Sequence, residues 1–141
     1  MDTPAESNSK KCEPNMSEQI VITLPMPPKV LTPNGRPFSR RGMIGKAVAA
    51  KKQRERARQE VEALMLETLP WGKVGVEYVF YHPVYRRRDD DNYIASMKSA
   101  RDGIVDAGLV VDDSNEYWLT QGAKFEKDTV KRVEIVMTRI K

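Results

Sequence analysis

The chain has 141 residues, a single cysteine and a formal charge of +4 at neutral pH. Its length fits one compact domain around one hydrophobic core. No run of about 18 apolar residues is present to span a membrane, and the apolar stretch of a signal peptide is missing, so we expect a cytoplasmic protein. Cys12 has no second cysteine with which to build a disulfide or a cysteine-based zinc site.

The first 18 residues differ in composition from the rest of the chain. They are rich in Ser, Asn, Lys, Glu and Pro and contain almost nothing that a core could bury. Such a segment cannot offset the entropy that it would lose on ordering. We therefore predict a disordered N-terminal tail over residues 1–18 and one folded domain over residues 19–141.

The first expected elements are a strand, a loop and a long helix. Ile20–Leu24 is short and β-branched, and the prolines that follow it predict that the strand ends there. Turn-forming residues predict a loop from Thr32 to Gly42. From about Lys46 to Leu69, good helix formers carry apolar residues at the spacing of one helix face, namely Ala50, Ala57, Val61, Leu64 and Met65.

This loop and helix are strongly basic. Between Arg36 and Arg58 there are nine basic residues and a single acid, Glu55, which gives a local charge of nine minus one, or +8. A charge of this size suits a polyanion, although a run of charges is also typical of a solvated helix face. The nine are Arg36, Arg40, Arg41, Lys46, Lys51, Lys52, Arg54, Arg56 and Arg58.

The second half of the chain predicts three more strands and one more helix. Apolar residues alternate along Lys73–His82, which predicts a strand with one apolar face, and helical spacing over Asn92–Ala107 predicts a second helix. Tyr117–Phe125 and Lys131–Ile140 follow as strands joined by a polar loop, which suggests a hairpin. The order β-α-β-α-β-β predicts an α/β (α+β) fold with a mixed four-stranded sheet packed by two helices.

Three adjacent aspartates precede the second predicted helix. If the chain is extended there, Asp89 and Asp91 project to one side while Asp90 faces away. Converging carboxylates repel each other, so their convergence implies a cation, and hard oxygen ligands favour Mg²⁺ or Mn²⁺. The alternative is an acidic surface loop neutralised by its basic neighbours, Arg86, Arg87 and Arg88.

A calcium loop of the EF-hand type is excluded at this position. Counted from Asp89, that pattern requires a ligand, a glycine and a glutamate at three later positions. Tyr93, Ile94 and Ala100 occupy them.

A second acidic pair, Asp112 and Asp113, follows the second predicted helix. A helix of about four turns would return the chain toward the sheet and deliver one of these carboxylates to the same site. Lys98 follows Asp91 by seven residues, close to two helical turns, so its ammonium group could also reach the site. Asp102 could hold Lys98 by a helical ion pair, although an ordinary surface pair explains the spacing equally well.

Residues 86–113, RRRDDDNYIASMKSARDGIVDAGLVVDD, resemble the signature of the RusA family of Holliday-junction resolvases, small dimeric endonucleases common in phages and prophages. IVITLPMPP resembles the opening strand of that family, RRRDDDN its first acidic cluster, KSARD its lysine-bearing helix and AGLVVDD its second acidic cluster. The resemblance implies that Asp89, Asp91 and Asp113 are catalytic and bind the metal, and that Lys98 is the catalytic lysine. The segment NYIASM is about one helical turn longer than in the best-known member, which keeps the lysine on a similar face.

The family resemblance implies a Mg²⁺-dependent endodeoxyribonuclease, with Mn²⁺ as a substitute ion, that nicks branched DNA in recombination and repair. A two-fold homodimer would offer one active site to each of the two equivalent strands of a four-way junction. A less selective branched-DNA or flap nuclease and a non-catalytic DNA-binding module are the alternatives. Candidate phosphate contacts are Arg86, Arg87 and Arg88 beside the site, and Arg36, Arg40, Arg41, Lys51 and Lys52 on the loop and first helix.

Three further side chains have simpler expected roles. We expect Trp71 and Trp118 to pack in the core. We expect His82 to end a strand rather than act as a base, because a metal would already supply the activated water.

Overall fold

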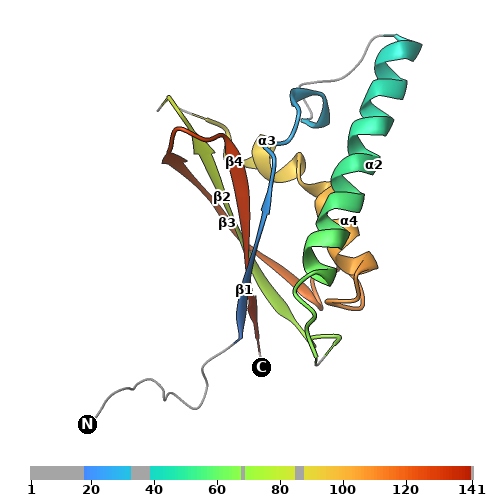
Figure 1. Cartoon of the computed structure of the whole chain (residues 1–141), viewed down its shortest axis with the longest axis vertical. Coiled ribbons are helices and arrows are strands. Elements are labelled where there is room, and N and C mark those ends of the chain that lie inside the picture. The colour runs from blue at the N-terminus through green and yellow to red at the C-terminus, as the bar shows by residue number, and fades with distance from the viewer. Residues whose placement is uncertain (1–17, 33–38, 68, 85–87, 141) are drawn as a thin grey trace.

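A computed structural model describes residues 18–32, 39–67, 69–84 and 88–140 (Figure 1). Four strands form one mixed sheet in the order β1-β4-β2-β3. Strand β4 is antiparallel to both of its neighbours, whereas β2 and β3 are parallel. The strands are β1 (Gln19–Leu24), β2 (Val74–His82), β3 (Trp118–Lys127) and β4 (Arg132–Arg139). The predicted mixed four-stranded sheet is therefore confirmed.

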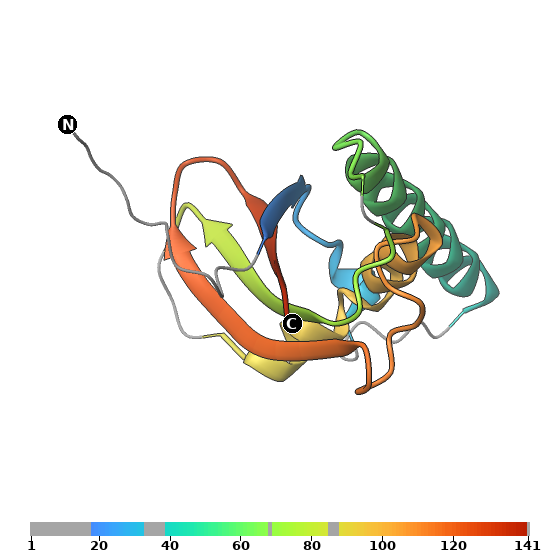
Figure 2. The same ribbon diagram turned by 90° about the horizontal axis from the view of Figure 1, so that it is seen from below.

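The helices cover one face of this sheet (Figures 1 and 2). They are the short 3-10 helix η1 (Lys29–Leu31), the long helix α2 (Arg40–Glu62) and two shorter helices, α3 (Asp90–Ala95) and α4 (Lys98–Asp106). The core lies between the layers and includes Tyr78 and Phe80 of β2, Ile104 of α4 and both tryptophans. Trp71 and Trp118 are 1% and 2% exposed, which confirms their predicted packing role.

The predicted hairpin of the last two strands is wrong. Strand β2 lies between β3 and β4, so these two strands run antiparallel without pairing with each other. Residues 128–131 carry the chain past the end of β2, where Asp128 N donates to His82 O at 2.9 Å. The parallel pairing of β2 with β3 requires a crossover connection, and α3 and α4 supply it.

The predicted bounds of the first helix are wrong at both ends. Helix α2 begins at Arg40, because the Ser39 side chain accepts a hydrogen bond from Gly42 N at 3.0 Å and caps the helix. The predicted loop therefore ends earlier, and Arg40 and Arg41 are helical. At the other end the helix stops at Glu62, and Met65 has a positive φ of 51°.

The second predicted helix is interrupted. Helix α3 ends at Ala95 and α4 starts at Lys98, with Ser96 and Met97 between them. The Ser96 hydroxyl donates to Tyr93 O, a local bond that competes with helix continuation. Met97 is fully buried and anchors the break in the core.

The first described residue, Glu18, was predicted to lie in the N-terminal tail. Residues 1–17 lie outside the described residues. Glu18, which the prediction placed in the tail, pairs with Arg139 at 2.6 Å, and its carbonyl accepts from Arg139 N at 2.7 Å. Glu18 thus belongs to the folded domain. In the described ranges no helix combines the length and apolar character needed to cross a membrane.

Candidate functional site

Lys98 joins two parts of the acidic motif. Its ammonium nitrogen lies 2.7 Å from Asp113 Oδ2 and 2.9 Å from Asp102 Oδ1. Asp102 is one turn further along α4, whereas Asp113 follows the helix in the loop that leads to β3. The possible ion pair between Lys98 and Asp102 is therefore present, and Lys98 also contacts one of the three aspartates that the resemblance assigns to catalysis.

Arg101 holds Asp113 from a second direction. Its Nη2 donates to Asp113 O at 3.0 Å and lies 3.6 Å from Asp113 Oδ2. The guanidinium group sits over the Trp118 ring, 5.2 Å from its centroid. The sequence interpretation missed Arg101, although its place three residues after Lys98 puts it on a neighbouring part of the same helix surface.

These contacts fix the charges of the cluster. Hydrogen bonds to Asp113 and then to Asp102 raise the pKa of Lys98 above its ordinary value of 10.5. The hydrogen bond from Lys98, with the nearby charges of Lys98 and Arg101, lowers the pKa of Asp113 below its ordinary 3.8. Both groups are therefore charged at neutral pH, and the Lys98 side chain is 60% exposed to a ligand from solvent.

A buried hydroxyl lies near this cluster. Tyr78 on β2 is fully buried, and its hydroxyl has no hydrogen-bond partner among the described residues. Burial raises its pKa above the ordinary value, with opposing influences from the charges of Arg101 and Asp113. Tyr78 is therefore neutral, and it lies near enough to Arg101 and Asp113 for their charges to influence its hydroxyl.

The first acidic cluster begins helix α3. Asp89 is the N-cap, and its Oδ1 accepts from Asp91 N at 3.1 Å and from Asn92 N at 3.5 Å. Asp90 and Asp91 form the first helical turn, so the extended conformation assumed for the three aspartates is wrong. Acidic side chains are favourable at a helix N-terminus, which explains their tolerance here. Together with Arg88 they border an open surface depression of about 650 Å³.

Tyr93 fastens α3 to the sheet. Its ring meets those of Phe80, Phe125 and His82 edge to face, at centroid distances of 5.0, 5.1 and 5.7 Å. His82 is the last residue of β2 and is 6% exposed, as expected of a strand-end residue. Arg88 donates to the Tyr93 hydroxyl at 3.3 Å and to Val84 O at 3.3 Å.

The three predicted metal ligands are not gathered around one point. Asp113 is engaged by Lys98 and Arg101, while Asp89 caps its own helix. Within the described ranges, no three acidic, histidine or cysteine side chains are placed to share an ion. Carboxylate oxygens are the donors that Mg²⁺ prefers, but the side-chain positions are not those of an assembled three-carboxylate site. Metal binding stays a prediction from the motif.

The basic residues of α2 fall into two groups. Toward its C-terminal end, Arg54 pairs with Asp106 at 2.6 Å, Arg56 with Glu60 at 3.0 Å and Arg58 with Glu62 at 2.9 Å. Toward its N-terminal end, the basic side chains form no ion pair with another described residue. We call these the unpaired basic group, and its members are Arg40, Arg41, Lys46, Lys51 and Lys52.

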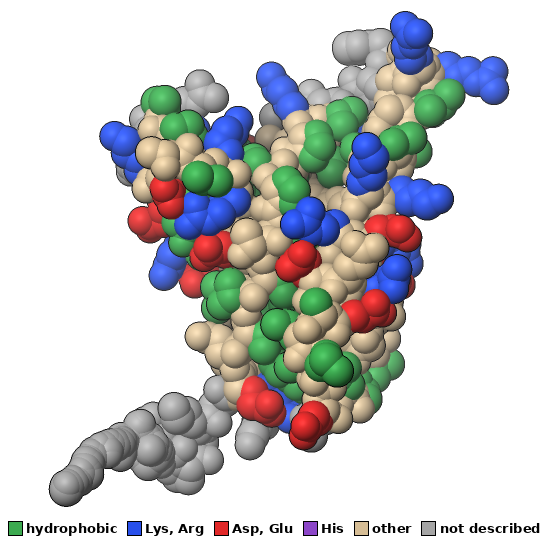
Figure 3. All heavy atoms as spheres, viewed as in Figure 1, with side chains coloured by type: hydrophobic (Ala, Val, Ile, Leu, Met, Phe, Trp, Pro, Cys, Tyr) green, Lys and Arg blue, Asp and Glu red, His purple; other side chains and the backbone are tan. Residues whose placement is uncertain are grey.

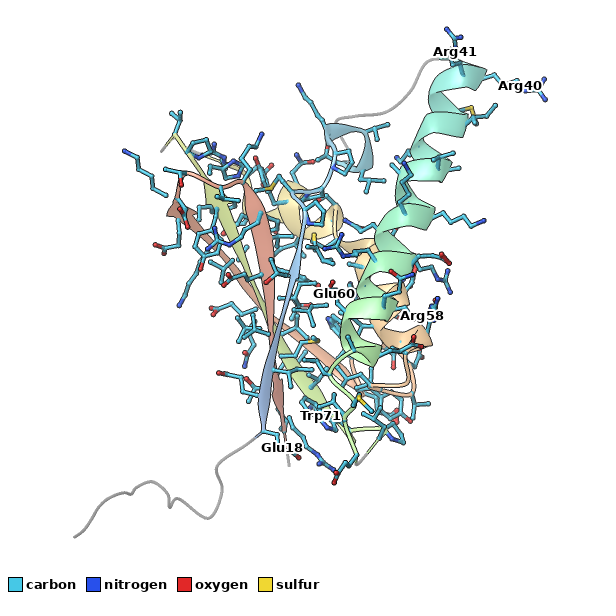
Figure 4. All side chains as sticks on the ribbon, in the orientation of Figure 1. Glu18, Arg40, Arg41, Arg58, Glu60 and Trp71 are labelled. Atoms are coloured by element: carbon cyan, nitrogen blue, oxygen red, sulfur yellow. The ribbon has the colours of Figure 1, made fainter. Side chains whose placement is uncertain are left out.

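This division is visible on the molecular surface. Lys and Arg gather over the upper part of α2, and acidic side chains join them only lower down (Figure 3). Arg40 and Arg41 point outward from the end of the helix, away from the sheet (Figure 4). Three further predicted phosphate contacts lie outside the described residues, namely Arg36, Arg86 and Arg87.

No family model matches the sequence. An uncharacterized protein of Xylella fastidiosa (strain Temecula1 / ATCC 700964) is 38% identical over 95 residues, which make up 65% of this chain and 59% of that protein. The chain therefore spans less than two thirds of the relative's length, and the relative's description names no activity.

Proposed function

We propose that this protein is a magnesium-dependent, structure-selective endodeoxyribonuclease that resolves Holliday junctions by paired nicks, as the RusA family does. In this proposal it acts as a cytoplasmic homodimer on branched DNA in recombination and repair. The observation that carries the proposal is the 2.7 Å contact between Lys98 and Asp113. The motif assigns both residues to catalysis, and they meet although fifteen positions separate them in the chain.

Lys98 is suited to stabilise negative charge rather than to accept a proton. Its two carboxylate partners raise its pKa, so the group is an ammonium ion at neutral pH. It is also exposed enough to meet a phosphate from solvent. A cation held at a fixed position lowers the energy of the charge that develops on phosphorus oxygens in the transition state. Arg101 would keep Asp113, and through it Lys98, in position.

The proposal includes Mg²⁺, with Mn²⁺ as a substitute, on Asp89, Asp91 and Asp113. Such an ion supplies an activated water and neutralises charge on the reacting phosphate. Shared binding of one ion by all three aspartates would require their side chains to move from the positions described above. The metal is therefore supported by the motif and by the chemistry of the donors, and not by their present arrangement.

The unpaired basic group supports DNA as the substrate. Its five cations lie on one helix and form no ion pair with another described residue. They create a local positive potential (Figure 3). Phosphate contacts of this kind provide most of the sequence-independent affinity for DNA. A small neutral substrate would gain nothing from them.

A cleavage assay distinguishes the proposal from its two alternatives. We would incubate the full chain with a labelled four-way junction, a flap and a linear duplex, each with and without Mg²⁺. Metal-dependent, symmetrically placed nicks in the junction alone are expected. Equal cleavage of the flap would favour a less selective branched-DNA nuclease, and binding without any cleavage would favour a DNA-binding module.

Lys98 provides a matched test of the same proposal. Lys98→Met should lower the single-turnover cleavage rate by about 100-fold or more, the cost of removing one preorganised charge-stabilising donor. Lys124→Met is the control, because Lys124 also pairs with an acid, Glu77 at 3.7 Å, but does so on the sheet face away from the helices. Equal rates for the two variants would contradict the role of Lys98.

A further inference from the structure

A groove separates the exit of β1 from helix α2. It has a volume of about 500 Å³ and lies where the chain leaves the sheet toward η1 and runs beside α2 (Figure 1). The β1 side consists of Leu24 and the proline-rich segment that follows it, residues 25–28. Because proline lacks the N–H of a sheet ladder, this segment turns away from β4 and leaves space in front of the helix.

The helix side of the groove has a regular composition. Two rows of residues at i, i+4 spacing face it, so they share one side of α2. The first row is Gly45, Ala49 and Gln53, and the second is Val48, Lys52 and Arg56. The small residues of the first row create the hollow, and Val48 adds an apolar wall that is 48% exposed.

Charge is confined to one edge of the groove. The Gln53 amide already contacts other residues of the protein. Its Oε1 accepts a hydrogen bond from Ala100 N at 3.1 Å, and its Nε2 lies 3.8 Å from Met97 Sδ. Arg56 pairs with Glu60 at 3.0 Å. Lys52 forms no ion pair with another described residue and belongs to the unpaired basic group. The groove is thus an apolar cavity with the ammonium group of Lys52 at its edge, and no acidic side chain among the described residues pairs with that group.

We propose that this groove receives one unpaired nucleobase of single-stranded DNA, with Lys52 contacting the neighbouring phosphate. An apolar hollow with a few polar groups at its edge is typical of sites for small planar ligands. The positive charge that continues along α2 to Arg40 favours a polyanion over an apolar peptide. The inference rests on the proposed function, because a base would become unpaired where the base pairs at the branch point of a junction open.

The test compares two labelled strands of equal length, one with bases and one abasic, by fluorescence anisotropy in EDTA. Wild-type protein should bind the base-containing strand at least about five-fold more tightly, because the apolar groove would remove part of the base surface from water. Ala49→Phe fills the groove and should bring this ratio close to one. The control is Ala47→Phe, an exposed position that does not line the groove, and it should keep the wild-type ratio.

A second variant protects the test against a folding defect. Val48→Glu places a carboxylate at the exposed apolar wall and should also reduce the ratio, with circular dichroism confirming that the fold is kept. A wild-type ratio near one, or a ratio that Ala49→Phe leaves unchanged, would overturn the proposal. The proposal would also fail if the groove variants changed the molar mass on light scattering and kept the wild-type binding ratio. The groove would then be a contact between copies of the chain. Junction cleavage by the wild-type protein is measured separately with Mg²⁺, so a failure of the proposed function is distinguishable from a failure of the groove.

Discussion

Asp113 and Lys98 make a charged pair whose contribution to folding depends on pH in a defined way. The folded pKa of Asp113 is lowered, so its contribution is present above its unfolded pKa near 3.8 and is lost as pH falls through the folded value. The folded pKa of Lys98 is raised, so its contribution is present below about 10.5 and is lost as pH rises through the folded value. Between about pH 3.8 and pH 10.5, the contribution of the pair to the free energy of unfolding should not change with pH.

Asp113→Asn should therefore destabilise the protein at pH 7, and this destabilisation should shrink progressively as pH falls below 3.8. The loss of one carboxylate also leaves Lys98 and Arg101 close to each other without their shared partner. Urea unfolding of wild type and variant at pH 7 and pH 3 measures the difference. In the Lys98→Met background the same substitution should cost less at pH 7, and an equal cost in both backgrounds would contradict the pairing.

Gly103 marks the closest approach of α4 to α2. A Cβ at this position would collide with the backbone carbonyl of Arg54 and lie 3.1 Å from Ala57 Cβ. Because backbone atoms cannot move aside cheaply, Gly103→Ala should destabilise the fold by about 1–3 kcal/mol. Gly45→Ala is the helical control, with nothing within 4 Å of the added Cβ, and should be neutral or stabilising by about 0.5–1 kcal/mol. Urea unfolding that ranks the two variants equally would contradict the close packing.

At the scale of elements, the two groups of basic residues on α2 should differ in DNA binding. Arg40→Ala combined with Lys51→Ala removes two members of the unpaired basic group. It should lower affinity for a four-way junction and reduce the slope of log K against log salt concentration by about 0.9 for each lost phosphate contact. Arg54→Ala combined with Arg58→Ala removes the same charge from residues that already pair with acids, and should change the slope little. If anisotropy titrations gave the two double variants equal salt slopes, the two groups of basic residues would not differ in DNA binding.

The elements themselves were predictable to different degrees. Alternation along β2 predicted Lys73–His82, and the strand is Val74–His82, because one fully buried face leaves a clear period of two. The start of α2 was missed because the cap depends on one side chain, Ser39, within a turn-rich segment. The break between α3 and α4 does not interrupt the apolar spacing, so periodicity alone could not reveal it.

The candidate site shows the same limits. Proximity of Lys98 to Asp102 followed from helical spacing, which is a local property. The contact with Asp113 depends on where the chain returns after α4, and the orientation of Asp89 depends on its use as a cap. Local rules could therefore identify the charged residues but not place the first acidic cluster relative to the second.

For the whole molecule, the strand order depends on pairing between distant segments, which the sequence pattern did not specify. Placing β2 between β4 and β3 gives the most apolar strand a partner on each side. It also makes α3 and α4 a single crossover, so both acidic clusters and Lys98 come from the connection between two adjacent parallel strands. This connection is the structural unit that carries the proposed chemistry.

A homodimer is expected because a four-way junction has two equivalent strands to nick. Light scattering coupled to size-exclusion chromatography should give twice the chain mass of 16.1 kDa at micromolar concentration. Addition of a four-way junction should produce a complex with two protein chains. A mass of one chain per junction, at all concentrations tested, would contradict paired cleavage by a dimer.

In the proposed function, Asp89, Asp91 and Asp113 support metal-dependent cleavage of branched DNA. The most direct measurement is the single-turnover cleavage rate of a labelled four-way junction with Mg²⁺ for wild type, Asp91→Asn and Asp113→Asn. Glu126→Gln, an exposed carboxylate on β3, serves as the control for loss of one negative charge. Both aspartate variants should lose cleavage while binding the junction as tightly as wild type or more tightly, and the control should cut normally. Cleavage at the wild-type rate by either aspartate variant would show that the motif carboxylates are not catalytic.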